Sequence, residues 1–368
     1  MKWFVTYLEF LQYSLIEEAI VPTSSRDIDW TDMMRWAEQQ AIVGIIYRGI
    51  QRAGKALNMP FDVLMEWVGY ANQIEMQNRL INKRCIEVVE MLSHDGFKCC
   101  ILKGPGNASM YPEPLLRSSG DIDVLVKANN KKDGSGVRSV IEYVRRKNPF
   151  GRASYHHVDY GNYNGVKVEI HYRPTYMCSP IHNIRLQKLL LIDGNVQNID
   201  LIGENSYIPI PFWDFNVVYQ LIHIYRHLLN EGIGFRQIID YYYLLKNEEC
   251  RVKNEEGSAS RAIVLEHLGL AKISGAVMWV LKEVFGLEEK CLIAPVDERR
   301  GRFLLWEILR GGNFGKYDTR GYFVRWNNPI GSCLRHVERD MRLVRYFPSE
   351  CLWEPVFRVY HFGWRLVH

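Results

Sequence analysis

The sequence lacks the features that mark several classes of protein. Its eight cysteines include no Cys-x-x-Cys pair, so nothing supports a zinc ribbon or a thioredoxin-like motif. No window approaches the roughly 18 continuous apolar residues of a membrane-spanning helix, and Met1-Lys2-Trp3-Phe4 does not begin a signal-peptide pattern. Gly311-Gly312-Asn313-Phe314-Gly315 has no following Lys-Ser or Lys-Thr, which excludes a P-loop and favours a turn. We therefore expect reduced cysteines, no membrane association and a cytoplasmic location.

A large excess of charge of one sign is also absent. The 368 residues include 46 Lys and Arg against 42 Asp and Glu, so the formal net charge is only +4. Nucleic-acid-binding domains usually carry a clear basic excess, and we expect no nucleic-acid partner. The hydrophobic fraction of 47% and the charged fraction of 24% are ordinary for globular proteins, so a large core is available.

Hydrophobic spacing divides the chain into three regions. Residues 1–96 have helical periodicity, including one long helix over about 61–93. Residues 97–210 carry short β-prone runs between turns, and residues 211–368 return to helical spacing. We predict an α+β, predominantly helical fold. In it a small mixed β-sheet core at 97–210 is flanked by N-terminal (1–96) and C-terminal (211–368) helical subdomains.

Alternating apolar residues place four strands in the central region. The predicted strands span 97–102, 121–126, 153–160 and 166–173, with a helix over 137–147. The last two strands are joined by Gly161-Asn162-Tyr163-Asn164-Gly165, which is a good hairpin connection.

Two carboxylates open the second of these strands. Residues two apart in a strand point to the same face, so Asp121 and Asp123 project together while Ile122 faces the core. Neighbouring carboxylates repel each other unless a cation lies between them, and Mg²⁺ (or Mn²⁺) prefers such oxygen ligands. Glu169, on a later strand, is the best candidate for a third ligand, as phosphoryl and nucleotidyl transfer would require. The alternatives are an ordinary strand start for the aspartates and a solvated strand position for the glutamate.

Other polar side chains accompany Glu169. Glu169, His171 and Arg173 alternate along one predicted strand, share a face, and are expected to line a cleft. Strand position alone explains His171 and Arg173 equally well. One of the adjacent His156 and His157 must face the same side as Glu169, where hydrogen bonding across the sheet is favoured over a role in the cleft.

Several motifs of this region occur together. They are Leu102-Lys103-Gly104, Tyr111-Pro112 with Arg117, Gly120-Asp121-Ile122-Asp123-Val124-Leu125-Val126, and Val168-Glu169-Ile170-His171-Tyr172-Arg173. On these motifs the chain resembles the uncharacterised nucleotidyltransferase family of the polymerase-β-like superfamily. The resemblance implies a minimal nucleotidyltransferase fold in which Asp121, Asp123 and Glu169 hold Mg²⁺. It also implies transfer of a nucleoside monophosphate from an NTP to an unidentified acceptor hydroxyl or phosphate, with Glu169 helping to deprotonate a hydroxyl.

The chain departs from the superfamily at the turn after the first strand. Most members carry Gly-Ser or Gly-Gly there, whereas this sequence has Lys103-Gly104-Pro105, in which the proline removes a hydrogen-bond donor and the lysine adds charge. Lys103 and Arg117 are predicted to contact phosphates, with a solvated surface as the alternative. The predicted nucleotide-binding residues are Lys103, Gly104, Arg117, His171 and Arg173. The altered turn keeps two other hypotheses open, a catalytically silent nucleotide- or partner-binding module and a phosphoester hydrolase.

A polar group follows in the C-terminal region and also resembles the family. His223 and His227 are four residues apart and share a helix face, and with Asp240 they suggest zinc. The His-Glu-x-x-His signature is absent, so a polar network with Arg236 and Asp240 beside the cleft is favoured. The spacing of Arg236 and Asp240 also suits an ordinary helix salt bridge.

Overall fold

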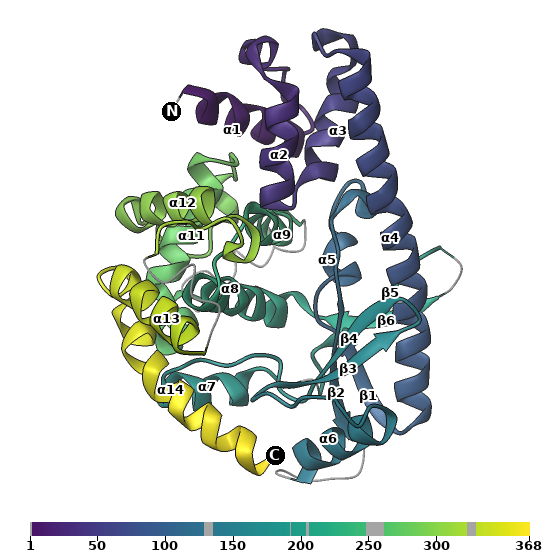
Figure 1. Ribbon diagram of the computed structural model, residues 1–368, viewed down its shortest axis with the longest axis vertical. Coiled ribbons are helices and arrows are strands. Elements are labelled where there is room, and N and C mark those ends of the chain that lie inside the picture. The colour runs from purple at the N-terminus through teal and green to yellow at the C-terminus, as the bar shows by residue number, and fades with distance from the viewer. Residues whose placement is uncertain (1, 129–134, 192, 204–205, 248–260, 322–328) are drawn as a thin grey trace.

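Helices surround a small sheet in this protein, as the computed structural model shows (Figure 1). The structure describes residues 2–128, 135–191, 193–203, 206–247, 261–321 and 329–368. The predicted α+β, predominantly helical fold with a small mixed sheet is confirmed. Within the described residues, no helix combines the length and apolar character that crossing a membrane requires.

Four helices form the N-terminal part of the fold. They are α1 (Lys2–Leu15), α2 (Trp30–Gln40), α3 (Val43–Ala53) and α4 (Phe61–His94). The long α4, predicted over 61–93, runs from the other three helices to the sheet (Figure 1). It ends at Asp95 and Gly96, where the glycine has φ +88°, a conformation that L side chains rarely adopt.

The central sheet has four strands in the order β1-β2-β4-β3. They are β1 (Phe97–Ile101), β2 (Ile122–Ala128), β3 (His157–Tyr163) and β4 (Val166–His171). β1 pairs antiparallel with β2, and β3 pairs antiparallel with β4, while β2 and β4 are parallel. The sheet is therefore mixed, as predicted.

Several predicted strand boundaries differ from those observed, and hydrogen bonding explains two of the differences. β3 and β4 meet at a two-residue turn, Asn164-Gly165, with φ of +47° and +94°, so β3 extends to Tyr163. At the other end, the backbone N–H groups of Tyr172 and Arg173 both donate to the His156 carbonyl oxygen. This contact ends β4 at His171, two residues earlier than predicted.

The sheet has one apolar face and one polar face. Ile122, Val124 and Ile170 are fully buried in a hydrophobic cluster with residues of α4 and α6 (Ser135–Lys147). Because side chains alternate along a strand, Asp123 and Glu169 project from the opposite face. The carboxylates therefore point away from α4 and α6.

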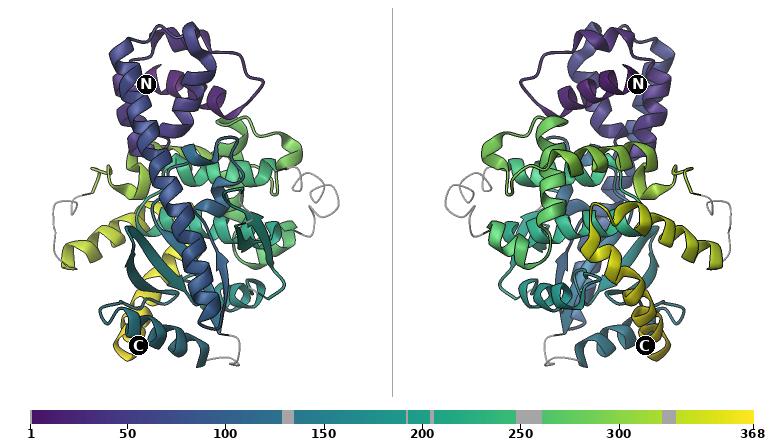
Figure 2. Two further views of the ribbon diagram at one scale, coloured as in Figure 1. Left: turned by 90° about the vertical axis from the view of Figure 1, so that its right-hand side faces the viewer. Right: turned by 90° about the vertical axis from the view of Figure 1, so that its left-hand side faces the viewer.

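The remaining elements lie around the central sheet and beyond it (Figure 2). They are α5 (Pro105–Ala108), α7 (Pro180–Leu189), the strand pair β5 (Val196–Asp200) and β6 (Tyr207–Pro211), α8 (Trp213–Asn230), α9 (Phe235–Lys246), α11 (Ala271–Glu283), α12 (Glu298–Gly311), α13 (Pro329–Leu343) and α14 (Pro348–Val367). Short 3-10 helices occupy Thr23–Asp27, Gly54–Ala56, Pro114–Leu116, Glu289–Cys291 and Asn313–Gly315.

One hydrophobic core joins the N-terminal helices to α8, α9 and α11. The rings of Trp36 and Phe235, for example, lie 5.8 Å apart between centroids. The division of the chain into subdomains at residues 96 and 210 thus stays a prediction, since the first and third of these regions share a core.

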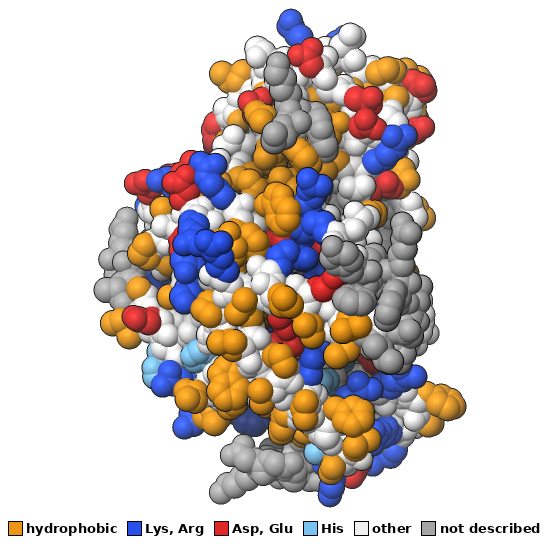
Figure 3. All heavy atoms as spheres, turned by 60° about the vertical axis from the view of Figure 1, so that its left-hand side comes forward, with side chains coloured by type: hydrophobic (Ala, Val, Ile, Leu, Met, Phe, Trp, Pro, Cys, Tyr) orange, Lys and Arg blue, Asp and Glu red, His pale blue; other side chains and the backbone are white. Residues whose placement is uncertain are grey.

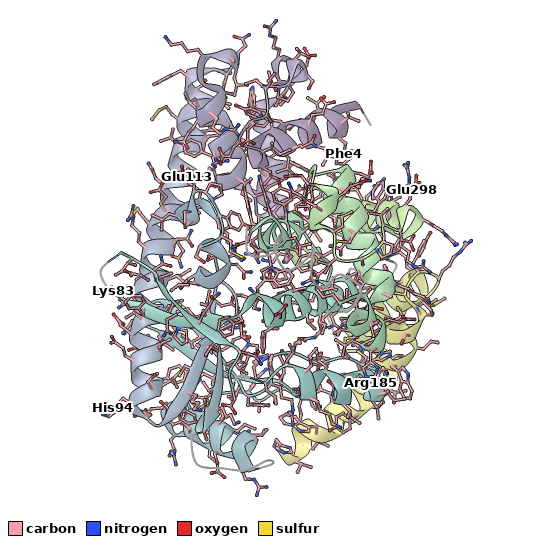
Figure 4. All side chains as sticks on the ribbon, turned by 180° about the vertical axis from the view of Figure 1, so that it is seen from behind. Phe4, Lys83, His94, Glu113, Arg185 and Glu298 are labelled. Atoms are coloured by element: carbon pink, nitrogen blue, oxygen red, sulfur yellow. The ribbon has the colours of Figure 1, made fainter. Side chains whose placement is uncertain are left out.

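The last helix, α14, has a polar contact on its inner side and an apolar outer side. The Glu350 carboxylate accepts hydrogen bonds from the backbone N–H groups of Cys178 (2.5 Å) and Ser179 (3.3 Å), just before α7. Figure 4, in which Arg185 marks α7, shows the two helices together. Hydrophobic side chains gather on the face seen in Figure 3. Those exposed on α14 are Leu352, Trp353, Val356, Val359, Tyr360, Phe362, Leu366 and Val367.

A buried carboxyl group at the contact of α13 with α14 makes stability depend on pH. Burial, together with the charge of Glu354, raises the pKa of Asp340 to about 8, although Arg358 and Arg339 oppose the rise. The unfolded pKa is about 4, so folding takes up a proton between these two values. The free energy of unfolding therefore falls as the pH rises through that window.

We expect Asp340→Asn, which needs no proton uptake, to raise the unfolding temperature most near pH 8 and less near about pH 5. Thermal denaturation followed by circular dichroism measures the effect, with Glu298→Gln at an exposed ion pair as the control. A parent chain with the same unfolding temperature at both pH values would contradict the prediction.

Candidate active site

A cavity of about 290 Å³ lies between the polar face of the sheet and helices α8 and α9. Lys103 and Gly104 from the turn after β1 line it, as do side chains of β2, β4, α8 and α9. Seven of the residues predicted from sequence meet here, namely Lys103, Gly104, Arg117, Asp121, Asp123, Glu169 and His171. These residues therefore line one cavity.

Adjacent parallel strands bring two of the predicted metal ligands together. Asp123 of β2 is the register partner of Glu169 of β4. One ligand atom each from Asp123, Glu169 and His171 lie within 4.8 Å of one another. Asp121 lies one residue before β2 and lines the same cavity outside this group. The structure therefore groups two carboxylates with a histidine, and the metal role of Asp121 stays a prediction.

Asp123 is held in its ionised form. Its carboxylate is 4% exposed and lies 2.9 Å from Lys103 Nζ through Oδ2 and 2.8 Å from His171 Nε2 through Oδ1. Burial raises the pKa of Asp123, but Lys103 and His171 outweigh burial and hold this pKa well below its ordinary range. Burial alone would lower the pKa of Lys103, and Asp123 raises it. Both groups therefore stay charged.

Glu169 has the opposite shift, to which the neighbouring Asp123 carboxylate contributes. Burial, followed by the charge of Asp123, raises the pKa of Glu169, although Lys167 and His171 partly oppose the rise. Two carboxylates that destabilise each other in this way are the arrangement that a divalent ion relieves. The residues present thus fit a metal ion.

Three histidines lie beside the carboxylates. His156, His157 and His171 also have ligand atoms within 4.8 Å of one another. His157 is the register partner of His171 across the β3–β4 pair, and its Nε2 lies 3.6 Å from Glu169 Oε2. Burial lowers the pKa of His157 to about 3 and that of His156 well below its ordinary value. Both rings are therefore neutral at pH 7, and both line the cavity.

The turn after β1 depends on Gly104. It has φ +57°, a conformation rarely adopted by L side chains, and precedes the single turn of α5. The glycine lets Lys103 on its one side reach Asp123 while Pro105 on the other begins α5. Its nucleotide contact stays a prediction.

Arg117 forms a buried ion pair with Asp240. Its Nε donates to Oδ1 and its Nη2 to Oδ2, both at 2.6 Å, and the two side chains are 5% and 7% exposed. Tyr111 Oη and Asn107 Nδ2 also donate to this carboxylate. Asp240 therefore binds Arg117 across the cavity wall and not Arg236, the partner that helix spacing suggested. The phosphate contact predicted for Arg117 stays a prediction. The guanidinium group that would make it already forms an ion pair with Asp240.

Arg173 does not share the cleft with Glu169, and that prediction is wrong. Its Nη1 donates to the Tyr155 carbonyl oxygen at 2.5 Å, and its guanidinium lies 4.4 Å from the Tyr155 ring centroid. Because β4 ends at His171, the strand alternation that predicted the position of Arg173 no longer applies there.

The histidines of α8 contact each other and Glu231, and their predicted network with Arg236 and Asp240 stays a prediction. His223 and His227 share a face, as predicted, with 3.0 Å between their Nε2 atoms, and His227 Nδ1 lies 3.2 Å from Glu231 Oε2. Burial lowers the pKa of both histidines.

The sequence interpretation missed Arg226, which also lines the cavity. Its signal was present, because Arg226 follows His223 by three residues and so shares its helix face. The sequence interpretation also missed Tyr219, which precedes His223 by four residues, lies on the same helix face and lines the cavity.

Comparison with known proteins supports the family suggested by the motifs. The model of a family described as "Uncharacterised nucleotidyltransferase" matches residues 26–286, which contain the whole sheet and helices α8 and α9. Among solved structures, the chain is similar to an antigenic nucleotidyltransferase-like protein from Paracoccidioides brasiliensis. The identity is 11%, the match covers 52% of this chain and 91% of that one, and the TM-score is 0.27, too low to support an inference. A search of curated proteins gave no match.

The contribution of the buried Arg117–Asp240 ion pair to stability can be measured without an activity assay. We expect Asp240→Asn to lower the free energy of unfolding by about 3–5 kcal/mol, because it leaves a buried guanidinium without its counter-charge. Urea denaturation measures the change. Arg302→Gln, at an exposed pair, should cost less than about 1 kcal/mol. Equal losses in the two variants would show that the buried pair has no special weight.

Proposed function

This chain belongs to the uncharacterised nucleotidyltransferase family, and from that membership we propose a metal-dependent transfer of a nucleoside monophosphate from an NTP to a hydroxyl or phosphate acceptor. The observation that supports the proposal best is the pairing of Asp123 with Glu169 on adjacent parallel strands, inside one cavity. The charge of Asp123 raises the pKa of Glu169, and a bound cation would offset this repulsion between the two carboxylates.

The proposed metal ligands are Asp123 and Glu169, with Asp121 at the edge of the same cavity. Their oxygen atoms suit Mg²⁺ or Mn²⁺. A bound ion of this kind would neutralise charge that develops on the phosphate oxygens during transfer. His171, hydrogen-bonded to Asp123, would orient that carboxylate.

In this proposal, side chains of the protein would accept the proton of the acceptor hydroxyl and keep the Asp123 carboxylate ionised. In the proposed reaction, the acceptor oxygen attacks the α-phosphorus, the bond to the β-phosphate oxygen breaks, and pyrophosphate leaves. The family resemblance assigns the proton of an acceptor hydroxyl to Glu169, which lines the cavity. Lys103 keeps Asp123 ionised through its ion pair.

A second candidate function is a catalytically silent nucleotide-binding module of the same fold. The observation in its favour is that Lys103 and Arg117, the cations predicted to contact phosphates, are both paired with carboxylates. Such a module would bind an NTP without releasing pyrophosphate. A hydrolase would instead release inorganic phosphate.

We expect Asp123→Asn and Glu169→Gln each to lower the rate of pyrophosphate release about 100-fold or more, the loss typical of removing a group that stabilises transition-state charge. The assay supplies each NTP with Mg²⁺ or Mn²⁺ and a panel of acceptors. Asp193→Asn is the matched control, since that exposed carboxylate pairs with Lys98 and Lys127 away from the cavity.

Calorimetry with the parent chain decides between the candidates. Measurable NTP binding without pyrophosphate release, across the whole panel, would favour the silent module. No NTP binding with either metal ion would reject both.

A further inference from the structure

The two cationic side chains predicted to bind phosphate already form ion pairs with carboxylates of the protein. Lys103 is paired with Asp123, and Arg117 with Asp240. A triphosphate nevertheless needs cationic hydrogen-bond donors beyond a metal ion, and guanidinium groups suit phosphate oxygens best. Such donors must come from another wall of the cavity.

Arg226 of α8 also lines the cavity. Its guanidinium carbon lies 3.7 Å from the centroid of the Tyr176 ring, which fixes the plane of the group. Nη1 has neutral neighbours, Thr175 Oγ1 at 3.3 Å and His156 Nε2 at 3.4 Å. Nε is buried and has no hydrogen-bond partner in the described part of the chain. Arg226 therefore offers an unsatisfied cationic donor.

Arg236 of α9 repeats this arrangement. It lines the same cavity, its Nη1 donates to the Ser118 carbonyl oxygen at 3.1 Å, and its buried Nε lacks a partner among the described residues. The guanidinium lies 5.5 Å from the Phe314 ring centroid. Burial and the nearby Arg117 lower the pKa of Arg236, although Asp240 opposes them. An anion would stabilise its charged form.

The loop that carries Phe314 is fixed in an unusual conformation. Phe314 has φ +57°, and a side chain at Gly315 would place its Cβ atom 1.8 Å from the Glu231 carbonyl oxygen. The loop thus packs directly against the end of α8. Backbone conformations of this kind cost free energy and cluster at functional sites. Here the conformation places an aromatic ring beside both Arg236 and His227.

We infer that Arg226 and Arg236 form the site that holds the phosphate chain of the nucleotide, in the cavity that Asp123 and Glu169 also line. This inference rests on the proposed function and adds the residues that recognise its substrate. Neither guanidinium forms an ion pair with a carboxylate of the described residues, and each is held against an aromatic ring with one N–H unsatisfied. The two arginines would supply the phosphate contacts that a Gly-Ser turn supplies in other members of the superfamily.

The test measures binding of inorganic tripolyphosphate and of ATP with Mg²⁺ to the full chain by calorimetry. Charge-assisted hydrogen bonds contribute about 1.5–3 kcal/mol each. We therefore expect Arg226→Gln and Arg236→Gln each to weaken both ligands about 10-fold or more, and the double variant about 100-fold or more. The lysine variants, which keep the charge but not the fork of donors, should recover part of the loss.

Arg52→Gln is the matched control. Arg52 also lies over a tyrosine ring, 4.6 Å from the centroid of Tyr13, and donates to backbone carbonyl oxygens, but it is outside the cavity. Its substitution should leave both affinities unchanged. Thermal denaturation of every variant separates lost binding from lost folding. If a glutamine variant does not fold, the corresponding lysine variant decides the outcome.

The arms of the experiment separate this inference from its alternatives. Tripolyphosphate should displace ATP; simultaneous binding of the two would assign the arginines to an acceptor phosphate and overturn the inference. An equal loss of adenosine binding would assign them to the nucleoside and overturn it as well. Unchanged ATP affinity in the double variant of an active enzyme would reject this inference alone. Arginine-dependent tripolyphosphate binding by a chain that transfers no nucleotide would reject the proposed transferase activity alone.

Discussion

The parallel pairing of β2 with β4 is the constraint on which the candidate site depends. It makes Asp123 and Glu169 register partners, so the two carboxylates face the same cavity at the spacing of neighbouring strands. β1 and β3 are the edge strands and pair antiparallel with β2 and β4. The face of the sheet opposite the carboxylates is buried in a hydrophobic cluster. A shift of one residue between β2 and β4 would send one carboxylate into that hydrophobic cluster.

Charge around the cavity is arranged in layers. Near the sheet, Lys103 neutralises Asp123, and the Arg117–Asp240 pair closes the wall beside α9. Arg226 of α8 and Arg236 of α9 have neutral hydrogen-bond partners among the described residues. The space thus has an acidic side and a cationic side, and a metal-bound polyanion is the kind of ligand that would satisfy both at once.

Local patterns predicted much of this arrangement, and long-range pairing set the rest. Strand alternation placed Asp123 and Glu169 on one face, and helical spacing placed His223 with His227, because both periodicities act over a few residues. Arg173 was misplaced because the His156 carbonyl oxygen, 17 residues earlier in the chain, ends β4. The pairing of Arg117 with Asp240 spans 123 residues, and no local pattern specifies such a partner. Helical spacing places Arg226 on the face of His223, but its hydrogen-bond partners among the described residues, Thr175 and His156, lie far away in the chain, and no local pattern specifies them.

Helix α4 links the N-terminal helices to the central sheet. Its 34 residues span roughly 50 Å at the usual rise of an α-helix. Near its middle, the buried side chain of Asn78 donates hydrogen bonds to the carbonyl oxygens of Leu115 and Arg117, at 2.6 and 2.7 Å. The same helix thus packs with α2 and α3, orients Arg117 against Asp240, and covers the apolar face of the sheet.

Such a helix has a consequence for how the protein comes apart. Unfolding of α4 as a whole would release Leu115 and Arg117 and uncover the apolar face of the sheet in the same event, so opening at the N-terminal helices and opening at the sheet are coupled. We therefore expect the N-terminal helices and the sheet to unfold as one cooperative unit. The walls of the cavity then keep their spacing until that unit is lost as a whole.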